Sequence, residues 1–234
     1  MGELCELCKF RGPLCDTLVQ GGGSYCGGSY CPRQSGCVCC AKGFSPAIEK
    51  LARSKRLRWS ILQLADPGWY KEAKHCPLLM SVEALATEYL ERGKVQGPPI
   101  PVELVALFDP QRKVELRPVP LKVYHGAIWP MGNRWIIHVN EKESSQTKRY
   151  TIFHEAFHIA CRTTCPEFKR VGLGFKLFSE LLADYFAACI LMPQEWIQEQ
   201  WPKVQDVRKM AYIFDVPVPA MWMRLKQLDL LGTP

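Results

Sequence analysis

The chain has 234 residues, of which 47% are hydrophobic and 23% are charged. These proportions are ordinary for globular proteins and exclude wholesale disorder, collagen and coiled-coil classes. The sequence contains neither a run of about 18–20 apolar residues nor a basic-then-apolar leader, so we expect a cytoplasmic protein with no membrane partner.

Cysteine and glycine dominate the N-terminal segment, residues 1–44. Eight of the 12 cysteines lie within the first 40 residues. In a reducing compartment, clustered thiolates bind zinc more often than they form disulfides. Cys5 and Cys8 have the spacing of a structural zinc site, and Cys37 and Cys40 are their candidate partners. The alternative is an irregular, Cys-rich tail that binds no metal.

Residues 45–80 are expected to form a basic helical linker. Ser45-Pro46 is typical of a helix start, and several arginines and lysines follow it. Residues 1–80 contain 11 basic and six acidic residues, so most of the net charge of +7 lies there. Such a surface either attracts acidic partners weakly or is simply solvated. Met80 is also an alternative start of the native protein.

Residues 81–200 are predicted to form one domain of helices and a small sheet. A helix is expected from Ser81 to about Arg92, and a short one from Val102 to Phe108. The three expected strands are Val114–Pro118, Val123–Ile128 and Trp135–Val139. Two longer helices follow, one from about Tyr150 and one from about Phe178 to Met192. The pattern indicates an α+β fold.

The string His154-Glu155-Ala156-Phe157-His158 carries the clearest chemistry. Residues four apart share one face of an α-helix, so both imidazoles can ligate one metal ion. Glu155 then lies where a general base is needed. Two histidines on a buried helix for purely structural reasons would cost several kcal/mol if unpaired, which disfavours that alternative.

A third ligand is expected from the helix that contains Glu180-Leu181-Leu182-Ala183-Asp184. Glu180 and Asp184 are four apart and share one side of that helix. We therefore expect Glu180 to bind the metal and Asp184 to hydrogen-bond one of the ligand imidazoles. The alternative, an exposed acidic pair, is disfavoured by the apolar neighbours of both residues.

These two motifs, together with the closing Leu191-Met192-Pro193, resemble the ImmA/IrrE metallopeptidase family. The resemblance covers about residues 81–231. It implies a zincin-like core in which a sheet of about three strands packs on the two motif helices. It also implies a catalytic Zn²⁺ held by His154, His158 and Glu180, with Glu155 as the catalytic base.

The oxyanion donor and the substrate-binding strand are less well specified. Tyr185 and His138 are candidate donors, although each is also compatible with a structural role. Trp135–Val139 is a candidate edge strand to which an extended substrate could add through backbone hydrogen bonds. Cys161 and Cys165 follow the first motif and are expected to fill small apolar gaps rather than to reach the metal.

The C-terminal segment, residues 201–234, contains a pattern typical of two helices joined by a turn. A DNA-reading helix-turn-helix displays polar residues on its second helix, and Arg224, Lys226 and Gln227 are the candidates here. Because the surrounding residues are mostly apolar, packing or partner docking is the favoured interpretation. Nucleic acid is thus a conceivable partner but not the favoured one.

The leading hypothesis is a zinc-dependent endopeptidase. By family analogy, its substrate is a protein, expected to be a helix-turn-helix transcriptional repressor. The alternative is a non-catalytic regulator that binds DNA or a repressor through the Cys-rich N-terminus and the C-terminal helices. One catalytic Zn²⁺ is expected in the first case, and a second, structural zinc ion would require the N-terminal cysteines.

Overall fold

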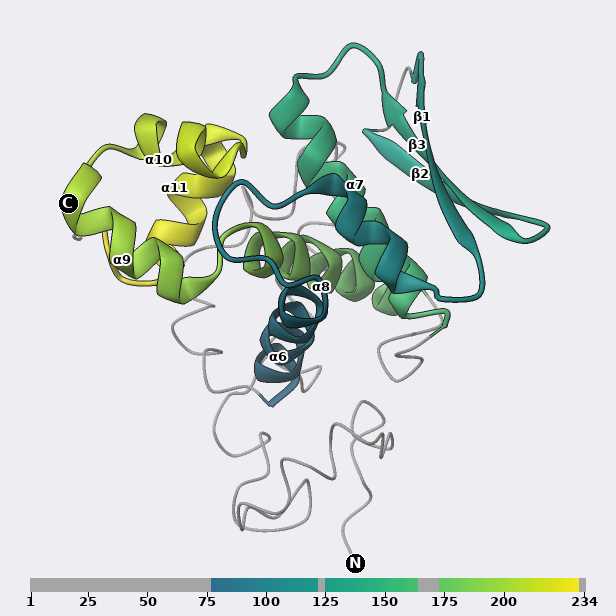
Figure 1. Cartoon of the computed structure of the whole chain (residues 1–234), viewed down its shortest axis with the longest axis horizontal. Coiled ribbons are helices and arrows are strands. Elements are labelled where there is room, and N and C mark those ends of the chain that lie inside the picture. Colours follow the sequence, from purple (N-terminus) through teal and green to yellow (C-terminus); the bar gives the residue numbers. More distant parts are fainter. Residues whose placement is uncertain (1–76, 122–124, 164–172, 232–234) are drawn as a thin grey trace, which may run out of the picture.

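The computed structural model describes residues 77–121, 125–163 and 173–231 (Figure 1). The predictions for the Cys-rich segment, including Cys5, Cys8, Cys37 and Cys40, and for the basic linker lie outside these residues. Within them, three consecutive strands form one sheet between two groups of helices, which agrees with the predicted α+β class. None of the described helices combines the length and apolar character that a membrane crossing requires.

The sheet has three strands in the order β1-β3-β2, with β3 in the centre. Strand β1 (Lys113–Val119) runs parallel to β3 (Arg134–Asn140), and β2 (Gly126–Met131) runs antiparallel to it. The interpretation of Trp135–Val139 as an edge strand is therefore wrong. Pro118 and Pro130 lie on β1 and β2, as expected for edge strands, because proline has no backbone N–H and is tolerated where that position faces no neighbouring strand.

Two long helices cross beside the sheet and form the centre of the molecule (Figure 1). Helix α7 (Ser145–Ala160) starts earlier than predicted because the Ser144 side chain accepts a hydrogen bond from the Thr147 amide and caps it. Helix α8 (Leu173–Leu191) also starts earlier and is rich in alanine where it meets α7. Small side chains let the two helix backbones approach closely.

Helix α6 (Pro77–Arg92) and the short helix η1 (Val102–Phe108) cover the other side of α8 and α7, respectively. Their aromatic side chains join one core. The Tyr89 and Phe108 rings stack with centroids 3.9 Å apart, and both meet Phe186 of α8 edge-on. In the view of Figure 1, α6 lies below α8 and packs against it.

Helices α9 (Gln194–Val204), α10 (Val207–Phe214) and α11 (Val218–Gln227) form a group at the opposite end from the sheet (Figure 1). Helix α9, which the sequence analysis does not predict, follows Pro193 and contains Pro202 in its last turn. Helices α10 and α11 lie where the sequence predicts them. Their buried residues, such as Met210, Phe214 and Leu225, belong to the same core cluster as the residues of α7 and α8.

Candidate metal centre

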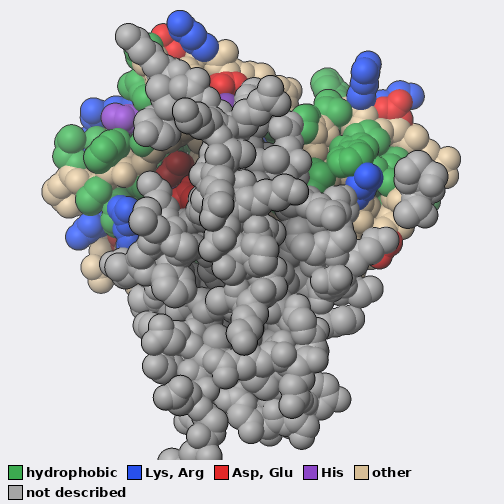
Figure 2. Space-filling model, turned by 180° about the vertical axis from the view of Figure 1, so that it is seen from behind, with side chains coloured by type: hydrophobic (Ala, Val, Ile, Leu, Met, Phe, Trp, Pro, Cys, Tyr) green, Lys and Arg blue, Asp and Glu red, His purple; other side chains and the backbone are tan. Residues whose placement is uncertain are grey.

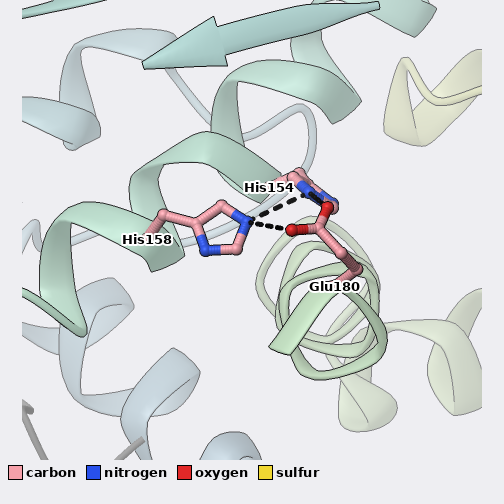
Figure 3. Close-up of side chains that lie close together, drawn as sticks. All are labelled: His154, His158 and Glu180. Carbon is pink, nitrogen blue, oxygen red and sulfur yellow. Dashed lines mark hydrogen bonds and ion pairs between the residues drawn. The ribbon is translucent and has the colours of Figure 1, made fainter. Parts of the chain in front are cut away.

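Three polar side chains meet between α7 and α8 (Figure 3). His154 and His158 project from one face of α7, and Glu180 projects from α8 towards them. The ligand atoms of the three residues lie within 4.8 Å of one another. The structure therefore brings together the three residues that the sequence predicts as metal ligands.

The distances between these atoms agree with a single tetrahedral ion. The two imidazole Nε2 atoms are 3.3 Å apart, and Glu180 carboxylate oxygens lie 3.2 Å from His154 Nε2 and 3.5 Å from His158 Nε2. A zinc ion with bonds of about 2.0–2.2 Å spaces tetrahedral ligands about 3.3–3.6 Å apart. Two imidazoles and one carboxylate are also a donor set that zinc accepts. The residues present thus fit a zinc ion.

Asp184 controls which nitrogen of His154 faces this point. Its Oδ1 lies 2.8 Å from His154 Nδ1, and its side chain is only 8% exposed. A carboxylate accepts a hydrogen bond from a ring N–H, so Asp184 holds a proton on Nδ1, and Nε2 is the ring nitrogen that faces Glu180 and His158. The hydrogen bond predicted for Asp184 is present.

The charges of this cluster respond strongly to one another. Burial opposes the charged form of His154, but the Asp184 and Glu180 carboxylates raise its pKa well above the usual value. Burial and the neighbouring charge on His154 lower the pKa of His158 to about 4. The carboxylates therefore stabilise positive charge on the His154 ring, and the lowered pKa of His158 keeps its ring neutral.

Glu155 lies on α7 beside strand β2 and is 8% exposed. Burial raises its pKa, against the opposing influence of the positive charges of His154 and Arg162. A carboxylate with a raised pKa is a stronger base, so this position suits proton transfer near neutral pH. An ideal side-chain carbon built on Gly126 of β2 would lie 3.3 Å from Glu155 Oε1.

The helices that present these groups are fixed to each other near the site. The buried Tyr150 hydroxyl on α7 donates a 2.8 Å hydrogen bond to the backbone carbonyl of Asp184 on α8. In addition, the rings of Phe157 on α7 and Phe186 on α8 pack against each other, with centroids 5.2 Å apart. These contacts hold the two motifs in register, so the geometry of the metal site is set by packing as well as by the donors.

Neither candidate oxyanion donor reaches the site. The buried Tyr185 hydroxyl donates to Glu83 of α6 instead. His138 pairs with Ala127 in the sheet, on the face opposite to the core residues Ile137 and Val139 that pack towards α7. Both expectations are therefore corrected: Tyr185 binds α6 to α8, and His138 lies on the far face of the sheet.

The polar residues of α11 do not form a DNA-reading surface. Arg224 and Gln227 are buried, with exposed fractions of 2% and 5%. Arg224 Nε donates to the backbone carbonyl of Met192 at the end of α8, 3.0 Å away. Lys226 lies over the ring of Trp222, 3.8 Å from its centroid. Arg224 and Gln227, two of the three candidates for DNA contact, are therefore buried in the packing of α11, as the favoured interpretation expects.

The predicted cysteine positions differ in what the structure describes. Cys161, which caps the end of α7, is 4% exposed and belongs to the hydrophobic core, as a gap-filling role requires. Cys165 lies outside the described residues. Among the described residues, His154, His158 and Glu180 are the group whose spacing suits a metal ion.

A comparison with protein families matches residues 111–226 to Peptidase_M78, described as the IrrE N-terminal-like domain. This region belongs to the ImmA/IrrE family of metallopeptidases. The match includes the sheet, both motif helices and helices α9 and α10, together with nearly all of α11. No curated protein matches the chain. The family match supports a peptidase function for this region, consistent with the donor set between α7 and α8.

Proposed function

We propose that this ImmA/IrrE-type domain is a zinc-dependent endopeptidase. The observation that carries the proposal is the convergence of His154 Nε2, His158 Nε2 and the Glu180 carboxylate at spacings of 3.2–3.5 Å. The ligand atoms of these three residues face one point, where a single cation could be held by all of them. When bound there, zinc supplies a Lewis acid that polarises the peptide carbonyl and acidifies water.

The chain's own residues have distinct tasks in this proposal. Glu155 takes a proton from the attacking water on its carboxylate and then delivers it to the leaving nitrogen. The raised pKa of Glu155 favours the first of these transfers. Asp184 keeps the His154 ring in one orientation and one tautomer throughout.

We further propose that the substrate is a helix-turn-helix transcriptional repressor, which places the reaction in the cytoplasm. This step rests on the family relationship, since ImmA/IrrE peptidases are expected to act in transcription regulation. The Glu180 side chain is 37% exposed, so this side of the site is open to solvent.

The test is incubation of purified candidate repressors with zinc-loaded wild-type protein and with Glu155→Gln. We expect cleavage at a defined bond by the wild-type protein and a rate about 10²–10⁴ times lower for the variant. Glu88→Gln, on the exposed side of α6, is the matched control. Equal rates for wild type and Glu155→Gln would refute the role of Glu155.

A further inference from the structure

Strand β2 begins next to the catalytic centre. At Gly126, a side-chain carbon would lie 2.4 Å from Thr151 Cγ2 and 3.3 Å from Glu155 Oε1, so only glycine lets the strand approach α7 this closely. The other neighbour of β2 is β3. In the part of the chain that the structure describes, no strand pairs with the second edge of β2.

The hydrogen-bonding pattern shows which backbone groups this open edge offers. The His125 carbonyl accepts from the Asn140 amide at 2.9 Å, so hydrogen-bonded pairs of β2 with β3 recur at every second residue from there. The backbone groups of Ala127, Trp129 and Met131 therefore face β3. Those of Gly126, Ile128 and Pro130 face the open edge, where proline offers a carbonyl but no amide.

Side chains alternate between the two faces of the strand. Gly126 faces α7, and so do Ile128 and Pro130, since they have the same parity. Trp129 and Met131 lie on the other face and are 55% and 58% exposed. Trp129 is paired with Ile136 of β3, which is only 2% exposed. Figure 2, a view from behind, shows hydrophobic side chains at the surface both at the end that holds the sheet and at the end that holds the C-terminal helices.

We propose that Trp129 and Met131 determine substrate specificity by selecting apolar side chains in an extended peptide bound along the open edge of β2. The proposal rests on the peptidase function above. We identify the substrate peptide as the molecule that binds this edge, because β2 starts beside Glu155. In a peptide strand added to β2, the Cβ atoms of alternate residues would lie about 4.5–5.5 Å from the Cβ atoms of Trp129 and Met131.

The position of the selected residues follows from strand geometry. Trp129 is three residues from Gly126 along β2, which corresponds to about 10 Å at about 3.3 Å per residue. The first selected side chain should therefore lie about three residues from the cut bond, and the second two residues further. Both fall on one side of the cut, because β2 extends from Glu155 in one direction only and turns into β3 after Met131.

The experiment is cleavage of a randomised peptide mixture, with peptides long enough to span β2, by zinc-loaded protein, followed by sequencing of the products. Wild-type protein, Trp129→Ser and Trp222→Ser are compared. Trp222 is a matched control because it is a partly exposed tryptophan on α11. Zinc content and thermal midpoint are measured for all three proteins.

We expect the wild-type protein to enrich aromatic and aliphatic residues at two positions, one about three residues from the cut bond and one two residues further along. Trp129→Ser should reduce the enrichment at the first position by about fivefold while leaving preferences next to the cut bond unchanged. Met131→Ser should do the same two residues further along. Trp222→Ser should match the wild type.

An unchanged profile for Trp129→Ser, or an equal change in Trp222→Ser, would overturn this proposal and leave the peptidase function standing. Absence of any cleavage by the zinc-loaded wild type has a different meaning. It would contradict the proposed function itself, and the specificity proposal would fall with it.

Discussion

Two groups of polar side chains lie in largely apolar surroundings, one between α7 and α8 and one between α8 and α11. In the second, Arg224 donates to the Met192 carbonyl and lies 3.5 Å from Gln227 Oε1. In the first, two imidazole Nε2 atoms and a carboxylate lie 3.2–3.5 Å from one another. The donors of Arg224 face acceptor oxygens, whereas the three groups between α7 and α8 have the spacing and the chemistry of a metal-binding set.

This difference separates a structural role from a chemical one. Buried polar groups are normally paired donor to acceptor, because an unsatisfied group costs free energy. A cluster of imidazole and carboxylate groups that converge on one point instead indicates a site for a metal ion. The same criterion assigns Arg224 to stability and His154, His158 and Glu180 to metal binding, although all four residues contact α8 or belong to it.

The largest effect is expected at the metal site. Glu180→Gln removes an anionic ligand oxygen, so zinc affinity should fall more than about 100-fold, beyond the loss caused by mutating residues behind a ligand. The measurement is competition for zinc against a chelator of known affinity. Glu195→Gln, an acidic residue exposed on α9, is the control and should keep wild-type affinity. Unaltered affinity in Glu180→Gln would mean that the carboxylate is not a ligand.

A smaller effect, and a different one, is expected at the α8–α11 group. Arg224→Met removes the donor to the Met192 carbonyl and should lower the free energy of unfolding by about 2–3 kcal/mol. Zinc affinity of the folded protein should not change. Urea unfolding measures the first quantity and chelator competition the second, with Arg208→Met on the exposed face of α10 as control. Loss of zinc affinity without loss of stability would reverse the assignments of the two groups.

Asp184 tests the α7–α8 group in a further way, because it hydrogen-bonds the ligand His154 without being a ligand itself. Asp184→Asn keeps the shape of the side chain but weakens the hold on the His154 Nδ1 proton. We expect zinc affinity to fall about 10–100-fold. The matched control is Asp206→Asn. The Asp206 side chain caps the N-terminus of α10, a helix that carries none of the three ligands. An Asp184→Asn protein with wild-type affinity would show that the hydrogen bond does not tune the metal.

The smallest effect is expected on the outer surface of α11. Lys226→Ala removes a cation from the face of the Trp222 ring and should cost about 0.5–1 kcal/mol of stability. Lys203→Ala breaks an exposed ion pair with Glu199, 2.9 Å long, and should cost less. Urea midpoints of the two variants decide the order. A larger loss for Lys203→Ala would contradict this reading of the C-terminal surface.

The sequence predicts local geometry well and long-range contacts poorly. The four-residue spacings of His154 and His158, and of Glu180 and Asp184, fix a shared helix face wherever the helix lies. Helix periodicity also argues against Tyr185 as an oxyanion donor. It is five residues from Glu180 and therefore lies about 140° around α8 from it. Strand alternation likewise places His138 opposite its core neighbours. Both signals were present in the sequence.

Other features depend on contacts between distant residues. Pro130 indicates that β2 is an edge strand, but the central place of β3 follows only from its pairing with both β1 and β2. The burial of Arg224 depends on a carbonyl 32 residues away. The approach of Gly126 to Glu155 joins a strand and a helix whose packing no local pattern specifies. Such contacts arise from the tertiary structure as a whole.

The most direct test is anomalous X-ray diffraction at the zinc edge from crystals of the zinc-loaded full chain. The account predicts a peak within bonding distance of His154 Nε2, His158 Nε2 and the Glu180 carboxylate. A zinc-replete crystal with no peak at that point, whatever zinc is bound elsewhere, would contradict it.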